Sequence, residues 1–205
     1  MRVHKIFPQE CLEFEYPSLL NWEELDTFLS TQVRYKGPTG LSHTHNALHK
    51  ELFLTRLTSW FRMCLEDARN HYSFQCEELR ITTCWANCAW GDVGLQHHAH
   101  DHPLSTVSGV FYASQSTART QFINPYYSHK IGRFDPHRTK DNNYWSAPSS
   151  PGTLLLFPSG LVHQTEPNWD AHNRWTISFN ALPHGECNWH SQGIETTSAT
   201  ILIPD

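Results

Sequence analysis

The sequence lacks any long hydrophobic run, and its longest aliphatic stretch is only the four residues Leu154 to Phe157. A helix that crosses a bilayer needs about 20 mostly apolar residues, so this stretch is far too short. The first eight residues, Met1 to Pro8, do not form the apolar core of a signal peptide. We therefore expect a soluble, cytoplasmic protein that has no membrane partner.

A surplus of positive charge is also missing. The chain has 15 Lys and Arg against 20 Asp and Glu, which gives a net charge of −5 and a pI near 6.3. The basic residues are scattered, whereas a nucleic-acid-binding surface usually gathers them into a patch. The composition therefore predicts no nucleic-acid partner.

Cysteines are too few and too dispersed for a disulfide scaffold or a thiolate metal site. The six are Cys11, Cys64, Cys76, Cys84, Cys88 and Cys187. A chain of 205 residues can bury a sizeable core without disulfides. Cys84 and Cys88 would share one face of a strand, but no second Cys pair completes a zinc site. We interpret the cysteines as free, buried thiols.

The length suits a single domain, 1–205, whose front is helical and whose back is rich in strands. Asn21 is placed to cap a short helix, with Glu24 at the reciprocal capping position. A second run has apolar residues at helical spacing from Leu48 to Ala68. We assign 1–78 to a helical support region, 79–182 to the catalytic core and 183–205 to a C-terminal extension.

From Leu79 onward the hydrophobic period changes from helical spacing to two. The predicted strands are Leu79 to Cys88, Leu104 to Ala113, Thr120 to Ile123, Thr153 to Phe157, Leu161 to Gln164 and Trp175 to Ala181. Such a series after helices predicts a mainly β protein, an antiparallel sandwich of the jelly-roll, cupin-like kind with N-terminal helices outside it. The long connection 126–151, which carries Phe134, Tyr144 and Trp145, is typical of a lid or binding loop.

Histidine is abundant, with 15 copies, and four of them crowd between His97 and His102. Imidazole is the commonest side-chain metal ligand. In an extended strand His98, His100 and His102 share one face, and two of them can chelate one ion. His163, from a separate strand, would complete a facial ligand set that leaves positions open, as non-haem Fe(II) oxygenases require.

Arg174 follows His163 by eleven residues and opens the last predicted strand. Ser178 shares a face of that strand with Arg174. A guanidinium with nearby hydroxyls suits a carboxylate, and hence a 2-oxo acid.

Three ordered blocks resemble a known family: Trp85-Ala86-Asn87, then His100 to Tyr112, then Gly152 to His163 followed by Arg174 to Asn180. They are similar to the 2-oxoglutarate/Fe(II)-dependent oxygenases with the signature H-x-H-P-x-S-x-L-S-G-V-Y-Y, then G-x-L-x-x-F-P-S-x-L-x-H, then R-x-S-I-S-F-N. The resemblance covers roughly residues 80 to 182, about half of the chain.

This resemblance implies a double-stranded β-helix that holds Fe(II) between the strands of His100 and His163. It implies that Arg174 pairs with the distal carboxylate of 2-oxoglutarate. It also implies a hydroxylation or related C–H oxidation that uses dioxygen and releases succinate and CO2. The resemblance says little about the substrate, and we expect an amino acid, a peptidyl residue or a small metabolite, because the fold class often acts on such compounds.

The ligand block departs from the His-x-Asp pair that most such oxygenases use, because no such pair exists here. We expect His100, His102 and His163 as the ligands, with His98 as the substitute. Asp101 would ligate only if the strand were bulged there, and otherwise it could orient an imidazole.

Five further residues have a plain interpretation, a functional interpretation or both. Tyr112 could contact 2-oxoglutarate or simply be a buried tyrosine with a partner for its hydroxyl. Trp85 belongs to the core or the substrate pocket, and Asn87 could reach that pocket. Asn124 also stands near it, but Asn124-Pro125-Tyr126 replaces the Asp-Pro-Arg frequent in relatives, which weakens any inference about substrate. His97 should lie on the opposite face, exposed or hydrogen-bonded, with no chemical role.

Two other function classes remain open. A three-histidine cupin-type dioxygenase would act without 2-oxoglutarate, and in that case Arg174→Ala would not affect its reaction. A non-catalytic jelly-roll metabolite binder would hold a structural metal with closed coordination, or none. The sequence leaves the oligomeric state open.

Overall fold

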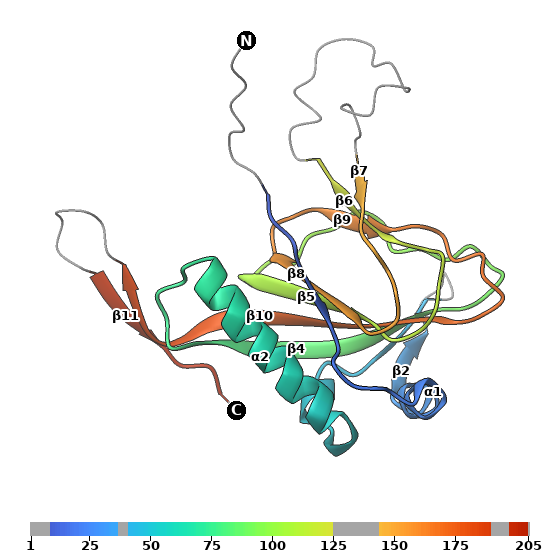
Figure 1. Cartoon of the computed structure of the whole chain (residues 1–205), viewed down its shortest axis with the longest axis horizontal. Helices are drawn as coiled ribbons and strands as arrows, with labels where there is room; N and C mark the ends of the chain where they lie inside the picture. Colours follow the sequence, from blue (N-terminus) through green and yellow to red (C-terminus); the bar gives the residue numbers. More distant parts are fainter. Residues whose placement is uncertain (1–8, 37–40, 125–143, 190–196, 205) are drawn as a thin grey trace, which may run out of the picture.

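An antiparallel sheet runs through the centre of the molecule in this computed structural model, which describes residues 9–36, 41–124, 144–189 and 197–204 (Figure 1). Its strand order is β1-β8-β5-β10-β4-β3-β2, and β11 pairs with the end of β10. Its strands are β1 (Leu12–Glu15), β2 (Val33–Lys36), β3 (Ser42–Thr44), β4 (Glu78–Ala89), β5 (Val107–Tyr112), β8 (Thr153–Pro158), β10 (Arg174–Trp189) and β11 (Thr197–Ile201). A smaller antiparallel sheet has the order β7 (Tyr144–Ser146), β6 (Thr120–Ile123), β9 (His163–Thr165).

The central strands bury both faces, and side chains alternate between them with the period of two expected for strands. On one face, residues such as Phe111, Leu156 and Phe179 pack against the two long helices, α1 (Trp22–Thr31) and α2 (Thr55–His71). On the other face, Tyr112 and Phe157 pack against the small sheet in a second cluster of buried residues. The predicted sandwich with helices outside it is confirmed. The predicted ligands His100, His102 and His163 lie on the side of the small sheet.

The helical front forms as predicted only in part. Asn21 caps α1, since its side-chain oxygen accepts a hydrogen bond of 3.2 Å from the backbone N–H of Glu24. The second predicted helix begins instead as two 3₁₀ turns, η1 (Leu48–Lys50) and η2 (Leu52–Leu54). Glu51 between them is extended, so the regular helix starts only at Thr55. Helical spacing of apolar residues identified the buried side but could not reveal this break.

Strands also occur where the sequence suggested other structure. The region 1–78 contributes β1, β2 and β3 to the large sheet beside its helices. Strand β10 continues past residue 182 and pairs with β11, so the C-terminal extension includes a hairpin that projects from the sheet (Figure 1). Strand β5 begins three residues later than predicted, because Leu104 adopts a positive φ of 59° in the turn before it.

Four of the six cysteines, Cys64, Cys76, Cys84 and Cys88, are buried as predicted, whereas Cys11 and Cys187 are only half-buried. Cys84 and Cys88 both lie fully buried on the helix-facing side of β4, and burial raises the pKa of the Cys88 thiol to about 12. All six cysteines are free. Within the described residues, no helix has the length and apolar character needed to cross a membrane.

Candidate metal centre

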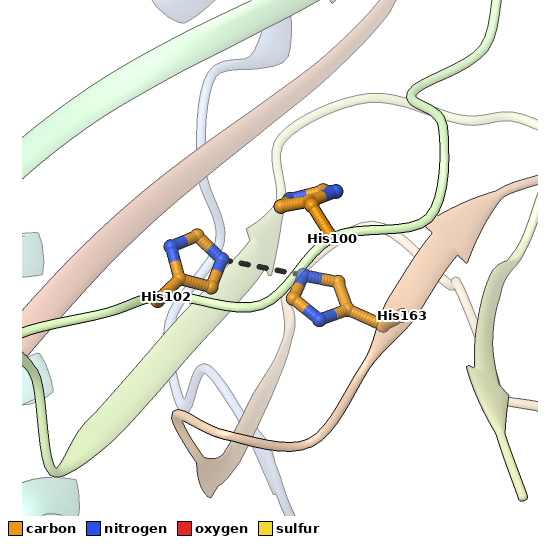
Figure 2. Close-up of side chains that lie close together, drawn as sticks. All are labelled: His100, His102 and His163. Carbon is orange, nitrogen blue, oxygen red and sulfur yellow. Dashed lines mark hydrogen bonds between the residues drawn. The ribbon is translucent and has the colours of Figure 1, made fainter. Parts of the chain in front are cut away.

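Three histidines converge between the two sheets, as Figure 2 shows. His100 and His102 come from the segment between β4 and β5, and His163 is the first residue of β9. One ligand nitrogen of each lies within 4.8 Å of the others. In the described parts of the chain this is the one cluster of three or more potential metal ligands.

The backbone of two segments brings these side chains together. His100 and His163 form an isolated antiparallel bridge, and each N–H donates to the other's carbonyl at 2.9 Å. Two residues along, the N–H of His102 donates to the Ser159 carbonyl at 2.9 Å. The prediction of an extended strand through 98–102 is therefore wrong. His100 and His102 still converge, because each is tied separately to the chain around β9.

The two alternative ligands that the sequence suggested lie outside the histidine cluster. His98 and Asp101 are both exposed, and neither belongs to the group of converging ligand atoms. The backbone carbonyl of His98 instead lies 2.7 Å from Nδ1 of His100. His98 therefore orients a neighbouring imidazole through its main chain.

Two of the rings have a defined tautomer. Nδ1 of His163 lies 2.9 Å from the Leu161 carbonyl, and Nδ1 of His100 faces the carbonyl of His98. A carbonyl can only accept, so in both rings Nδ1 carries a proton, and Nε2 is the nitrogen available to a metal ion. Burial lowers the pKa of His163 to about 3 and that of His102 to about 4, so both are neutral at pH 7. Neutral imidazoles with oriented lone pairs suit a metal ion.

Hydroxyl groups from the second and third sequence blocks hold the two segments in place. Ser108 on β5 donates to Oδ1 of Asn180 on β10 at 2.8 Å. Its oxygen also lies 2.9 Å from the hydroxyl of Ser159, which donates in turn to Ser105 at 2.9 Å. Since Ser159 also accepts the N–H of His102, this network fixes the chain that carries the histidines.

Arg174 provides a buried cation beside the cluster. Its Nε donates to the Ala118 carbonyl at 3.1 Å, and its guanidinium lies 5.6 Å from the centre of the Tyr112 ring. Its Nη2 is buried and has no hydrogen-bond partner within the described chain. A buried donor without a partner is costly, which indicates that an anion completes this site.

A small cavity of about 80 Å³ joins the histidines to Arg174. It is lined by Trp85 and Asn87 of β4, by Arg174, Thr176 and Ser178 of β10, by Val110, Thr120 and Thr165, and by His97, His100, His102 and His163. The cavity therefore brings together the predicted ligands, the predicted anchor, Ser178 and both predicted pocket residues of β4.

Two predicted residues lie elsewhere. The hydroxyl of Tyr112 donates to Oγ1 of Thr120 at 2.7 Å, so the plain interpretation, a buried tyrosine with a partner, accounts for it. Its ring lies against Arg174. Asn124 follows β6 and is not among the described residues that line the cavity. Of the predicted lid, 126–151, residues 126–143 lie outside the described residues.

Sequence reasoning missed His97. The expectation that it faces away from the site is wrong, because its side chain lines the cavity. The alternation on which that expectation was based applies only to a regular strand, and this segment is not one. No signal in the sequence shows the local bend, which depends on the hydroxyl of Thr165 accepting the N–H of His97 at 2.8 Å.

Comparison with known proteins agrees with this geometry. Residues 83–180 match a family described as "Putative 2OG-Fe(II) oxygenase". The match supports a 2OG-Fe(II) oxygenase, an oxidoreductase with iron and 2-oxoglutarate as cofactors. It spans just under half of the chain and includes every cavity residue discussed above. None of the curated proteins matches the chain.

Solved structures share the fold at low sequence identity. The carbocyclase SnoK from nogalamycin biosynthesis is 12% identical with a TM-score of 0.61, over 86% of this chain and 81% of that one. A Pseudomonas putida prolyl-4-hydroxylase is 11% identical with a TM-score of 0.61, over 86% and 94%. HygX from Streptomyces hygroscopicus, solved with nickel, 2-oxoglutarate and hygromycin B, is 13% identical with a TM-score of 0.58, over 85% and 83%. These matches confirm the jelly-roll fold.

Proposed function

We propose that the protein binds Fe(II) through His100, His102 and His163, and 2-oxoglutarate through Arg174. The reaction is hydroxylation, or a related C–H oxidation, of an amino acid, a peptidyl residue or a small metabolite. Dioxygen is the second co-substrate, and succinate and CO2 are the co-products. The observation that carries this proposal is the buried Nη2 of Arg174, which has no partner among the described residues and lies in the same cavity as the three imidazoles.

The ligand set suits a ferrous ion with open positions. Three imidazoles would hold the ion and leave further coordination positions for other ligands, and the exposed His100 leaves this site open to solvent. Neutral ligands leave the full +2 charge on the ion, whereas a carboxylate ligand would reduce it to +1. The bound iron would supply the chelation of 2-oxoglutarate and the activation of dioxygen. The extra charge favours a dianionic co-substrate.

Residues of β10 would hold the co-substrate. Arg174 offers Nη2 to the distal carboxylate as a charge-assisted donor, which is stronger than a neutral hydrogen bond. Ser178 and Thr176 present their side chains to the same cavity from the same face of β10. The Ala118 carbonyl binds Nε of the guanidinium and the Tyr112 ring lies against it, so that Nη2 is left to face the ligand.

The substrate would approach from the wall formed by β4. The ring of Trp85 lies 5.8 Å from the ring of His102, and Asn87 lines the cavity beside it. An apolar ring and an amide side chain suit a substrate with both an apolar body and a polar group. The lid expected from 126–151 stays a prediction.

Turnover of 2-oxoglutarate tests the proposal. With Fe(II) and air, the wild-type protein should convert 2-oxoglutarate slowly to succinate even without its substrate, and Arg174→Ala should lose this reaction. Arg34→Ala, at an exposed arginine of β2, is the matched control and should keep it. Succinate formation that is equal in all three proteins would contradict the assignment of Arg174.

The same experiment separates the remaining classes. A ligand set of three histidines without a carboxylate also suits a cupin-type dioxygenase that needs no 2-oxo acid, and such an enzyme would consume dioxygen with its substrate regardless of Arg174. A metabolite binder with closed coordination would consume neither. The exposure of His100 argues against closed coordination.

A further inference from the structure

The strand pairing fixes the position of His97 along the cavity. Residues that pair with one another across neighbouring segments form a row, and each such row is one level of the cavity. One level contains the metal cluster: His100 bridges to His163, and His163 pairs with Phe122 of β6. The next level contains His97, Thr165 and Thr120. The N–H of Thr165 donates to the His97 carbonyl at 3.1 Å, and Thr165 pairs with Thr120.

This second level is the one next to Arg174. Nε of Arg174 bonds to the carbonyl of Ala118, two residues before Thr120. Thr120 also accepts the hydroxyl of Tyr112, whose ring lies beside the Arg174 guanidinium. The cavity thus has a metal end, with three imidazoles, and an anion end, with Arg174 and His97.

The separation of the two levels fits the proposed co-substrate. Residues two apart on a strand, such as His163 and Thr165, are separated by roughly 6.6 Å. In 2-oxoglutarate two methylene groups separate the metal-chelating keto-acid end from the distal carboxylate, a span of roughly 5 Å from the C–C bond length. A molecule chelated at the metal level therefore places its distal carboxylate near the level of His97.

The state of His97 suits a hydrogen-bond donor. Burial, then the nearby His100 and Arg174, lower its pKa to about 4, so the ring is neutral at pH 7. A neutral imidazole always carries one N–H. Neither ring nitrogen has a hydrogen-bond partner within the described chain, although the backbone is held on both sides by Thr165.

We propose that His97 donates an N–H to the distal carboxylate of 2-oxoglutarate, and so binds the co-substrate together with Arg174. This rests on the proposed function and adds to it a second anchor, a residue that is not part of the three sequence blocks. A residue in this role contributes to 2-oxo acid affinity and to the preference for a dicarboxylate, and it leaves metal binding unchanged.

The test compares two ligands that differ only at the distal end. 2-Oxoglutarate and 2-oxopentanoate, which has a methyl group where 2-oxoglutarate has the distal carboxylate, are titrated calorimetrically into the anaerobic Fe(II)-loaded protein. The variants are His97→Ala and His97→Asn, which keeps an N–H donor, with His172→Ala as the control at an exposed histidine. Fe(II) affinity and thermal unfolding are measured for each.

His97→Ala should weaken 2-oxoglutarate binding about 10-fold or more, the loss expected for one hydrogen bond to a charged group. Binding of 2-oxopentanoate should hardly change, and His97→Asn should recover part of the loss. Equal weakening of both ligands, or no weakening of 2-oxoglutarate, would overturn the role of His97. Failure of the wild-type protein to bind 2-oxoglutarate would instead defeat the proposed function itself.

Discussion

Nε2 of His102 and Nε2 of His163 lie 3.3 Å apart, although 61 residues separate them in the chain. Two nitrogens that each lie roughly 2.1 Å from a metal and meet it at a right angle are about 3 Å apart. The pair is therefore already spaced as neighbouring ligands of one ion. Because the Leu161 carbonyl fixes the tautomer of His163, Nε2 of His102 is the donor in this pair, and metal binding requires that its proton move to Nδ1.

Removal of a proposed ligand should abolish metal retention. Changes to groups that merely support a ligand commonly cost 10- to 100-fold in affinity, so we expect His102→Ala or His163→Ala to lose at least about 100-fold in Fe(II) or Co(II) binding. Metal titration followed by absorbance measures this. His98→Ala and Asp101→Asn are matched controls and should bind like the wild type. A loss in Asp101→Asn as large as that in His163→Ala would show that the carboxylate ligates.

Arg174→Met should make the protein more stable and weaken its binding of 2-oxoglutarate. Arg174 is only 4% exposed, and its Nη2 has no partner in the part of the chain that the structure describes, so an apolar side chain of similar length should raise the free energy of unfolding by about 1 kcal/mol or more. The same change removes the proposed carboxylate anchor, which is worth on the order of 2 kcal/mol, or about 30-fold in 2-oxoglutarate affinity. Thermal unfolding and calorimetry check both effects. A variant that is less stable yet binds 2-oxoglutarate normally would refute this view of Arg174.

Gly109→Ala should destabilise the sheet below the site. A Cβ at this position would lie 2.3 Å from the ring of Phe179, so β5 or the ring must move. Overpacking of this kind typically costs about 1–3 kcal/mol. Gly160→Ala is the control, because nothing lies within 4 Å of its Cβ. Urea unfolding should show a large loss for the first variant and little for the second, and equal losses would contradict the packing described.

The metal-free protein should lose stability as the pH falls. The folded-state pKa values of His97, His102 and His163 are about 4, 4 and 3, below the ordinary value of 6.5. Between these limits the unfolded chain binds protons that the folded chain does not, so the free energy of unfolding falls as the pH drops from about 6.5 toward 4. Urea unfolding across this range measures the slope. His102→Gln should make it shallower, and an unchanged slope in that variant would argue against the shift.

Sequence reasoning found what periodicity and local chemistry encode. Strand β6 forms at its predicted bounds, Asn21 caps α1, and His100, His102 and His163 meet as expected. These depend on period-two patterns, on capping chemistry and on the ligand spacing. Similarly, Arg174 and Ser178 share a cavity because they share one face of β10.

The remainder depends on contacts between distant segments. His97 enters the cavity because both its backbone N–H and its carbonyl are hydrogen-bonded to Thr165. No periodicity in either segment predicts that contact. The extended Glu51 breaks a run whose apolar spacing is helical throughout. The edge strands β1 and β2 owe their structure to pairing with β8 and β3, since each is only four residues long.

The most direct test of the central claim is anaerobic addition of Fe(II) and 2-oxoglutarate to the purified protein, followed by visible spectroscopy. Chelation of 2-oxoglutarate by iron at the three-histidine site should produce a charge-transfer band that appears only when both are present, and that is lost in His163→Ala and weakened in Arg174→Ala. A wild-type protein that binds Fe(II) but shows no such band at any concentration of 2-oxoglutarate would contradict the proposed function.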